Sequence, residues 1–223
     1  MCGIFGVLSD GPVVNKIIKG LHKLEYRGYD SSGISVVVDQ KIQTIRAQGK
    51  LINLKKKLSN KKIEGTLGIG HTRWATHGIP STKNAHPHNS TNVSIVHNGI
   101  IENYSELKKD LLKKSYVFKS ETDSEVIAHL IDLNLKNSAP EQALKKTLSC
   151  LEGAFAIAIL FKDQNFLVGA RKGSPLAIGI SEKSFYLGSD SIALSPFTQK
   201  IIYMEEGDSV FIFKDKFNIF DST

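Results

Sequence analysis

The sequence predicts an α+β fold in which packed β-sheets are covered by helices. Candidate strands outnumber candidate helices along the 223 residues, and the helices come in groups instead of alternating strictly with strands. From Gly153 onward the chain reads almost entirely as short strands and turns. Strict alternation would predict a doubly wound parallel sheet, whereas this grouping favours sheets packed on one another with helices outside them.

Apolar runs, helical spacing and turn residues predict the elements of the first half. They are a strand over 2–8, a helix after Pro12, a hairpin over 33–38 and 41–47 with Asp39-Gln40 at its turn, a lysine-rich helix over 51–58, and strands over 66–71 and 93–97. A loop from 72 to 92 separates the last two strands. A loop of that length inside a compact domain is usually functional or mobile, which makes it a candidate for the site.

The second half begins with helices and ends with strands. The strand over 93–97 is expected to end at Asn98-Gly99. The expected helices lie over 102–114, 122–135 and 140–151, and the expected strands over 154–161, 165–170, 176–180, 185–189, 200–203, 209–214 and 217–220. Cys150 falls within the last of these helices, where we expect it to be buried.

Length and composition fit one soluble domain without disulfides. The chain is 41% hydrophobic and 23% charged, and its two cysteines, Cys2 and Cys150, lie far apart. That cysteine usage favours a reducing compartment. The N-terminus shows no signal-peptide pattern and no apolar stretch approaches the about eighteen residues of a membrane span, so we expect a cytoplasmic protein without membrane association.

The net charge of +7 raises the possibility of a nucleic-acid partner. The excess is mostly lysine pairs on expected helix faces, and no RNA-binding aromatic motif or zinc-ligand spacing accompanies them. We therefore interpret these lysines as a solvated surface and expect no nucleic-acid partner.

Cys2 is the most informative residue, because it follows the initiator methionine directly. Its side chain is small enough for ordinary removal of Met1, which would leave a thiol and a free α-amine on one carbon. These groups have ordinary pKa values of about 8.5 and about 7.7–8.0, so both titrate near working pH. An amine beside a nucleophile is a recognised means of activating it. Taken alone, Cys2 also fits a small buried residue that opens a strand.

Several other segments are too polar or too glycine-rich for scaffolding alone. They are 26–33 (YRGYDSSG), 71–78 (HTRWATHG), 84–88 (NAHPH), 96–99 (VHNG) and 122–125 (TDSE). Together with 2–6 (CGIFG), and in this order, they resemble the class II glutamine amidotransferases, which are N-terminal-nucleophile hydrolases. The form of segment 26–33, with 170–176 (ARKGSPL) and 187–190 (LGSD), is most similar to the glutaminase domains of the glucosamine-6-phosphate synthase family.

The resemblance implies a four-layer α/β/β/α sandwich with two antiparallel sheets. It implies a glutamine amidotransferase type-2 domain over 2–218, with 219–223 as the start of an interdomain linker. Synthases of this family continue into sugar-isomerase domains that bind fructose 6-phosphate, and the intact enzymes are expected to be homodimers. This sequence lacks the isomerase domains, so we expect it to hydrolyse L-glutamine to glutamate and ammonia, with the ammonia serving glucosamine 6-phosphate synthesis in the intact enzyme.

Asn98 and Gly99 suit the stabilisation of an oxyanion. Attack of the Cys2 thiolate on an amide carbonyl creates this charge and leads to a thioester, and hydrogen-bond donors must stabilise it. An amide side chain followed by a backbone N–H with no neighbouring Cβ meets that need. Asn-Gly is also a strong turn signal by itself. The resemblance implies the oxyanion role.

Free glutamine presents an α-carboxylate and an α-ammonium group. Arg73 can pair bidentately with the carboxylate and Asp123 can neutralise the ammonium. A lone Arg or Asp is usually a surface charge, but the resemblance implies that both hold the amino-acid end of glutamine. It adds Trp74, Thr76, His77 and Gly99 to the substrate-binding residues, and it gives Arg27 a supporting role near the nucleophile.

Trp74, the only tryptophan, lies inside the long loop. A large apolar ring there can act as a lid that excludes water, although a core anchor is the plainer interpretation. The chain has seven histidines, but their spacing matches no metal motif. The resemblance implies no metal and no cofactor, and we expect neither.

Two alternatives stay open at this point. A chain that retains Met1 has no free amine at Cys2 and fits an inactive, glutamine-binding regulatory module. A related N-terminal-cysteine amidohydrolase with a different amide substrate is the other alternative, and the combination of Arg73 with Asp123 argues against it.

Overall fold

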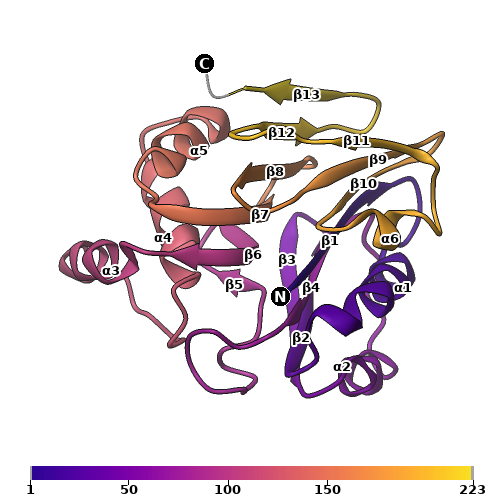
Figure 1. Cartoon of the computed structure of the whole chain (residues 1–223), viewed down its shortest axis with the longest axis horizontal. Helices are drawn as coiled ribbons and strands as arrows, with labels where there is room; N and C mark the ends of the chain where they lie inside the picture. Colours follow the sequence, from indigo (N-terminus) through magenta and orange to yellow (C-terminus); the bar gives the residue numbers. More distant parts are fainter. Residues whose placement is uncertain (1, 222–223) are drawn as a thin grey trace.

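Two antiparallel β-sheets lie face to face in the computed structural model, which describes residues 2–221 (Figure 1). The first sheet consists of β1 (Gly3–Ser9), β2 (Ser31–Val38), β3 (Lys41–Gln48), β4 (Leu67–Arg73), β9 (Ala177–Ser181), β10 (Ser184–Gly188) and β11 (Lys200–Tyr203). The second consists of β5 (His88–Asn89), β6 (Val93–Ile101), β7 (Gly153–Phe161), β8 (Leu167–Lys172), β12 (Ser209–Ile212) and β13 (Phe217–Phe220). Their strand orders are β11-β9-β10-β1-β4-β2-β3 and β13-β12-β8-β7-β6-β5.

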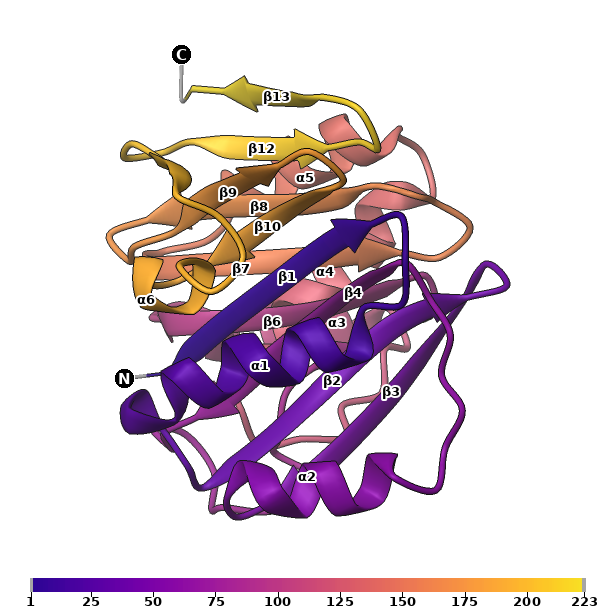
Figure 2. The same cartoon turned by 90° about the vertical axis from the view of Figure 1, so that its right-hand side faces the viewer.

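Helices cover the outer face of each sheet. The first sheet carries α1 (Val14–Leu24), which runs into a 3₁₀ turn (Glu25–Arg27), together with α2 (Leu51–Leu58) and the short α6 (Ser191–Leu194). On the side of the second sheet lie α3 (Tyr104–Lys113), α4 (Glu125–Leu135) and α5 (Pro140–Leu148). Figure 2 shows α1 and α2 in front of the first sheet. Within residues 2–221, no helix has the length and apolar character needed to cross a lipid bilayer.

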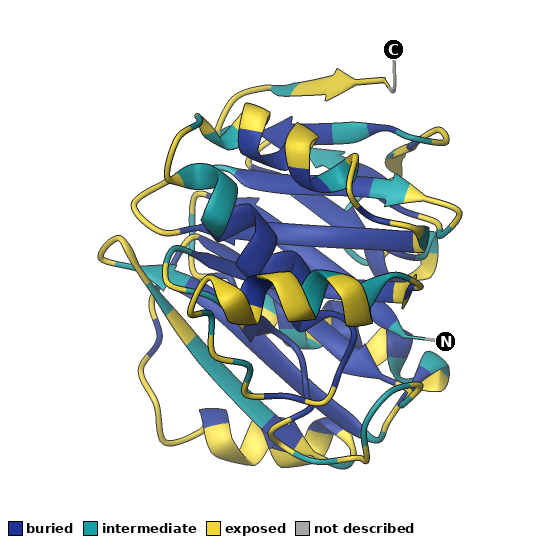
Figure 3. Cartoon of the chain, turned by 90° about the vertical axis from the view of Figure 1, so that its left-hand side faces the viewer, coloured by how far each residue is buried: buried dark blue, intermediate teal, exposed yellow. Residues whose placement is uncertain are grey.

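Buried apolar side chains form separate layers that explain the sandwich. One cluster joins the first sheet to α1, α2 and α6, and a second joins the other sheet to α3, α4 and α5. A third fills the space between the sheets. In β1, Phe5 and Val7 belong to the first cluster and Ile4 and Leu8 to the central one, because successive side chains of a strand point to opposite faces. The expected α/β/β/α sandwich is confirmed: its central strands are buried, whereas the edge strands β3 and β13 are more exposed (Figure 3).

The structure differs from the sequence prediction at β6. This strand continues through Asn98-Gly99 to Ile101, because its pairing with β7 stays in register as far as the pair Ile101–Gly153. The strand prediction over 93–97 was therefore too short. The helix expected over 122–135 begins only at Glu125, which leaves Asp123 in the segment before it.

Two further expectations about local structure were wrong. Helix α5 ends at Leu148, so Cys150 lies exposed in the turn that follows and is not buried in a helix. Helix α6 was not foreseen, since its four residues are too few for a helical pattern.

The C-terminal strand extends past the domain boundary expected from the sequence. β13 pairs with β12 from Phe217, opposite Ile212, to Phe220, opposite Ser209. The boundary expected at 218 therefore falls within a paired strand. Residues 222–223 of the expected linker, and Met1, whose removal the expected mechanism requires, lie outside the described residues.

Candidate active site

Cys2 lies at the start of β1, a central strand of the first sheet. β1 is flanked by β4 and β10, and Gly3 pairs with Thr72. The Cys2 Sγ lies 3.3 Å from the backbone N of Trp74 and 3.5 Å from its carbonyl oxygen. Burial raises the pKa of the Cys2 thiol, and the Trp74 hydrogen bond and the nearby charge of Arg73 offset this only in part. The thiol therefore needs a base to become a nucleophile at neutral pH.

The carbonyl oxygen of Cys2 accepts hydrogen bonds from two side chains. Arg27 Nε and Asn98 Nδ2 each donate to it at 3.0 Å. Arg27 Nη1 also donates to Asp190 at 3.0 Å, and the Tyr26 hydroxyl donates to the same carboxylate oxygen at 2.7 Å. Burial raises the pKa of Asp190, but hydrogen bonds from Tyr26 and the Ile192 N–H and the charge of Arg27 outweigh it, so the net shift is downward. Asp190 is therefore a charged anchor for Arg27.

The edge of β6 next to Cys2 is open beyond the short strand β5. β5 pairs only with Ser94 and Ile95. Further along, the His97 carbonyl and the Ile101 N–H on this edge bond to side chains. Alternate residues of a strand direct their backbone groups to the same edge, so we expect the Gly99 N–H on this side as well, beside the Asn98 amide.

Gly99 cannot be replaced without strain. Its φ is +127°, and a Cβ built there would lie 2.0 Å from the carbonyl oxygen of Ala154. Only glycine adopts this conformation readily and also permits so close an approach to the neighbouring strand.

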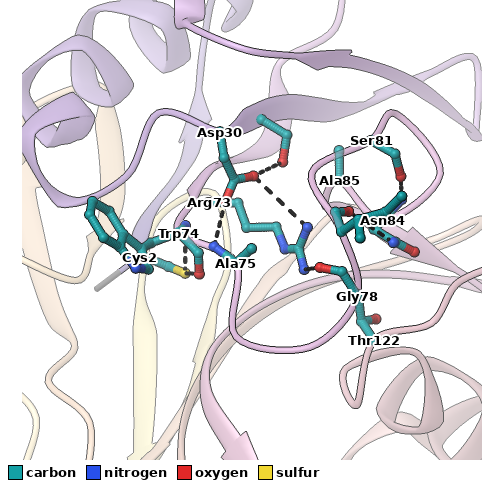
Figure 4. A network of polar contacts seen from close by, with 12 residues as sticks. Cys2, Asp30, Arg73, Trp74, Ala75, Gly78, Ser81, Asn84, Ala85 and Thr122 are labelled. Carbon is teal, nitrogen blue, oxygen red and sulfur yellow. Dashed lines mark hydrogen bonds and ion pairs between the residues drawn. The ribbon is translucent and has the colours of Figure 1, made fainter.

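The loop after β4 folds around the Arg73 side chain (Figure 4). Arg73 is buried, and its Nη2 donates to the carbonyl oxygens of His77 and, at 3.1 Å, Gly78. Its Nη1 lies 3.9 Å from Asp30 Oδ1. Asp30 accepts hydrogen bonds from the Ala75 N–H and, at 2.7 Å, from the Ser31 hydroxyl. Asp30 thus holds both the arginine and the backbone that follows it.

Asp123 lies on the far side of this loop. Its Oδ2 accepts a hydrogen bond from the Ile101 N–H at 2.9 Å, and its Oδ1 lies 3.9 Å from His77 Nδ1. The His77 ring packs edge-on against Tyr104 with a centroid distance of 5.3 Å, and Thr76 Oγ1 lies 3.4 Å from His77 Nδ1. Asp123 is therefore a buried carboxylate whose second oxygen faces the loop.

Trp74 has its indole ring at the rim of the site and not over it. The residue is 50% exposed, and its ring meets Tyr29 edge-on at 5.9 Å. A groove of about 880 Å³ lies elsewhere, between α5 and the strands β12 and β13, and it shares none of the candidate residues.

The structure gathers the residues expected from the sequence into one region. Cys2 is in direct contact with Arg27, Trp74 and Asn98. Gly99 directly follows Asn98 in the chain. The other candidates, on the loop and facing it, are Arg73, Thr76, His77 and Asp123.

Sequence reasoning missed three polar residues of this region. They are Asp30, His71 and Asp190. Asp30 and His71 lie in segments already noted for their polar character, and Asp190 lies in the segment 187–190 that supports the resemblance. Their roles depend on partners far away in the sequence.

The buried histidines beside the site are in ring contact, tilted between His71 and His86 and edge-on between His86 and His88. His71 and His86 have centroids 4.1 Å apart, and His86 and His88 4.4 Å apart. Burial lowers the pKa of His71 and of His88 to about 3, and holds that of His86 well below its ordinary value. Among residues 2–221, no group of three His, Cys, Asp or Glu side chains has the arrangement of a metal site.

Face-to-face antiparallel sheets, with a cysteine at the start of a central strand, define the class of N-terminal-nucleophile amidohydrolases. Residues 71–196 match the family model described as a glutamine amidotransferase domain, and the chain belongs to that family. The class expected from the sequence is confirmed.

Curated relatives share about half of their residues with this chain. It is 51% identical over 223 residues to a glutamine–fructose-6-phosphate aminotransferase (isomerizing) of Mesorhizobium japonicum, covering 99% of this chain and 37% of the relative. The protein of that name from Caulobacter vibrioides is 50% identical, with 100% and 37% covered. The chain thus spans little more than a third of the length of these relatives.

Solved structures agree on the fold. The glutamine phosphoribosylpyrophosphate amidotransferase of B. subtilis has a TM-score of 0.83 at 27% identity, covering 100% of this chain and 49% of that one. A glutamine aminotransferase class-II domain protein from Silicibacter pomeroyi has a TM-score of 0.70 at 13% identity, covering 99% of each chain, and shows likeness of fold alone.

Proposed function

We propose that this chain hydrolyses the side-chain amide of free L-glutamine through a thioester on Cys2. The observation that carries the proposal is the placement of Cys2 between two sets of groups. On one side lie the Asn98 amide and the open edge at Gly99, and on the other the loop that holds Arg73 and faces Asp123. A nucleophile, oxyanion donors and both charges needed for an amino acid thus meet at one place.

The proposed reaction begins after removal of Met1. The α-amine of Cys2, through a water molecule, takes the thiol proton, and the thiolate attacks the glutamine amide carbon. One N–H of the Asn98 amide donates to the Cys2 carbonyl, which leaves its second N–H, with the Gly99 N–H, for the oxyanion. The Cys2 α-ammonium gives its proton to the amide nitrogen of the tetrahedral intermediate, which leaves as ammonia, and a γ-glutamyl thioester remains. Water then attacks the thioester, which releases glutamate and restores the thiol.

Arg73 and Asp123 would recognise the amino-acid end of glutamine. The guanidinium pairs with the α-carboxylate and the carboxylate with the α-ammonium, with Trp74, Thr76, His77 and Gly99 around them. A glutamine side chain within a peptide lacks both charges, so this arrangement selects the free amino acid. Arg27 acts indirectly, by holding the carbonyl of Cys2.

The names of the relatives support a wider role for the whole protein. We propose that the released ammonia converts fructose 6-phosphate into glucosamine 6-phosphate on downstream isomerase domains, as the name shared by the relatives implies for them. A homodimer of the intact enzyme is part of this proposal. So is a cytoplasmic setting, which the free thiols of Cys2 and Cys150 favour.

The test compares two forms of the chain that differ only at the N-terminus. Mass measurement identifies a form that starts at Cys2 and a form that retains Met1, and each is assayed for glutamate release from glutamine. Release by the Cys2 form alone supports the proposal. Glutamine binding without release by either form would favour a regulatory module, and release from another amide but not from glutamine would favour a different amidohydrolase.

A further inference from the structure

His71, a residue of β4, joins the candidate oxyanion donor to the backbone of β6. It is fully buried, and its Nε2 lies 3.0 Å from the His97 carbonyl oxygen and 3.0 Å from Asn98 Oδ1. These two groups belong to consecutive residues of the other sheet. One ring nitrogen of His71 is therefore shared between a main-chain and a side-chain group at the site.

The His97 carbonyl decides which His71 nitrogen carries the proton. A carbonyl oxygen can only accept a hydrogen bond, so the Nε2 facing it must be the donor. The Asn98 atom facing that donor must then be the amide oxygen. The amide nitrogen of Asn98 consequently points the other way, where it donates to the Cys2 carbonyl at 3.0 Å.

A flipped Asn98 amide would be penalised twice. Its NH₂ group would face the His71 Nε2–H, and its oxygen would face the carbonyl oxygen of Cys2. Buried donors and acceptors opposed in this way lose both hydrogen bonds. The flip would also remove the N–H groups from the side on which an oxyanion forms.

The surroundings of His71 keep its ring neutral. Burial lowers the pKa of His71 to about 3, and the hydrogen bonds to Asn98 and His97 offset this only in part. Its Nδ1 has no hydrogen-bond partner among residues 2–221, and the His71 ring packs beside the ring of His86. In the neutral form with the proton on Nε2, the His97 carbonyl and the Asn98 amide oxygen both receive a hydrogen bond. The nitrogen without a proton is then Nδ1, which has no partner among the described residues.

We propose that His71 is a positioning residue for glutaminase activity: its Nε2–H fixes the Asn98 amide so that both N–H groups face Cys2 and the forming oxyanion. This inference rests on the proposed function. A purely structural role for His71, as a buried packing residue, is the competing explanation.

A double-mutant cycle separates these explanations. His71→Leu removes the donor, and we expect kcat to fall about 10–100-fold with KM changed less than about threefold, because loss of a whole oxyanion donor costs about 10²–10³ in kcat. His71→Gln, whose amide N–H can take the place of Nε2–H, should recover most of that loss. In an Asn98→Ala background, His71→Leu should cost less than about threefold more.

A matched control is His129→Leu, which removes another buried histidine, bonded to Ser90 and outside the site. It should lower Tm without lowering kcat. Two outcomes would overturn the inference. One is an equal loss of kcat from His71→Leu in the wild-type and the Asn98→Ala backgrounds. The other is a His71→Gln variant that folds but has a kcat as low as that of His71→Leu.

Measurements without turnover distinguish this inference from the proposed function. Nitrogen NMR of labelled histidine in the wild-type chain should show His71 neutral with its proton on Nε2, and the Asn98 side-chain N–H signals should be protected from exchange. A proton on Nδ1, or unprotected Asn98 signals, contradicts the inference even if no variant folds. Absence of glutamate release with these signals present contradicts the proposed function instead.

Discussion

Arg27 and Asp190 form an ion pair of 3.0 Å that ties the 3₁₀ turn after α1 to the start of α6. The same guanidinium donates to the carbonyl of Cys2, so Asp190 acts on the nucleophile through Arg27. We expect Asp190→Asn to lower the free energy of unfolding by about 1–2 kcal/mol, because hydrogen bonds to charged groups are lost, and to lower kcat for glutamine. Denaturant unfolding and glutamate release measure the two effects.

The exposed pair of Arg171 and Glu206 serves as the control for this prediction. Its N–O distance is 2.9 Å, but Glu206 is largely exposed. Glu206→Gln should therefore change stability by no more than about 1 kcal/mol and leave kcat unchanged. Equal effects of Glu206→Gln and Asp190→Asn would refute a special role for the Arg27–Asp190 pair.

Cys2→Ala should abolish glutamate release and leave the fold intact. The side chain lies just before the first residue of β1 and contributes to none of the apolar clusters, so its loss costs little packing. The matched control is Cys150→Ala, which removes the other thiol from an exposed turn and should leave activity unchanged. Residual turnover above a few per cent in Cys2→Ala, with an unchanged circular dichroism spectrum, would rule out Cys2 as the nucleophile.

Arg73→Gln and Asp123→Asn should each raise KM for glutamine strongly. Removing one charge of a buried ion pair costs on the order of 2–5 kcal/mol of binding, which is at least about 30-fold in affinity. Asparagine is chosen because its side-chain oxygen can still accept the Ile101 N–H bond that Asp123 accepts now. Asp110→Asn, at an exposed carboxylate, is the control. KM values near wild type in both variants would show that glutamine binds elsewhere.

The loop after Arg73 should close when glutamine binds. The ring of Trp74 is half exposed at the rim, so closure over the substrate should shift its fluorescence to shorter wavelength. Asp30→Asn, which weakens the hold on Ala75 and Arg73, should reduce this shift and raise KM. Fructose 6-phosphate should change neither the fluorescence nor glutamate release by this chain. Stimulation by the sugar would reveal a phosphosugar site within these residues.

Acid should destabilise the protein from about pH 6.5 downward. An unfolded histidine titrates near pH 6.5, whereas burial lowers the pKa of folded His71 and His88 to about 3. Between these values the unfolded state binds protons that the folded state excludes, so stability is lost as pH falls, by up to about 1.4 kcal/mol per pH unit for each such histidine.

His86→Leu tests this origin of acid sensitivity. His86 is buried, and neither ring nitrogen has a hydrogen-bond partner among the described residues, so an apolar side chain suits the position. Denaturant unfolding at several pH values should give a shallower loss of stability for His86→Leu than for wild type between pH 6 and 4. His22→Leu, at an exposed histidine, should keep the wild-type slope. Identical slopes for all three proteins would contradict the explanation.

Features with local causes could be predicted from the sequence, whereas pairings over long distances could not. The hairpin of β2 and β3 was placed correctly because Asp39 and Gln40 tolerate the positive φ angles, 48° and 62°, of its turn. Asn98-Gly99 was predicted to end a strand because Asn-Gly is a common turn sequence. In the structure the strand continues, because β6 goes on pairing with β7, and the sequence near Gly99 gives no sign of this pairing.

The candidate site shows the same division. The polar segments predicted a nucleophile, oxyanion donors and charged residues, because each role needs a particular residue type, and the structure brings these side chains into one region. Asp30 and Asp190 escaped notice, since their partners Ala75 and Arg27 lie 45 and 163 residues away. Their roles follow from the sheet order, which depends on packing of the whole chain.

The position of β1 between β4 and β10 has a consequence for the order of events during synthesis. The Ile4 N–H donates to the hydroxyl of Ser189, 185 residues later in the chain. At about 5–20 residues per second, the ribosome adds that serine roughly 10–40 s after Ile4. During this interval the N-terminus has no β10 beside it and is accessible to the aminopeptidase that the proposed mechanism requires for exposing the α-amine of Cys2. The proposed nucleophile can thus mature before the sheet around β1 is complete.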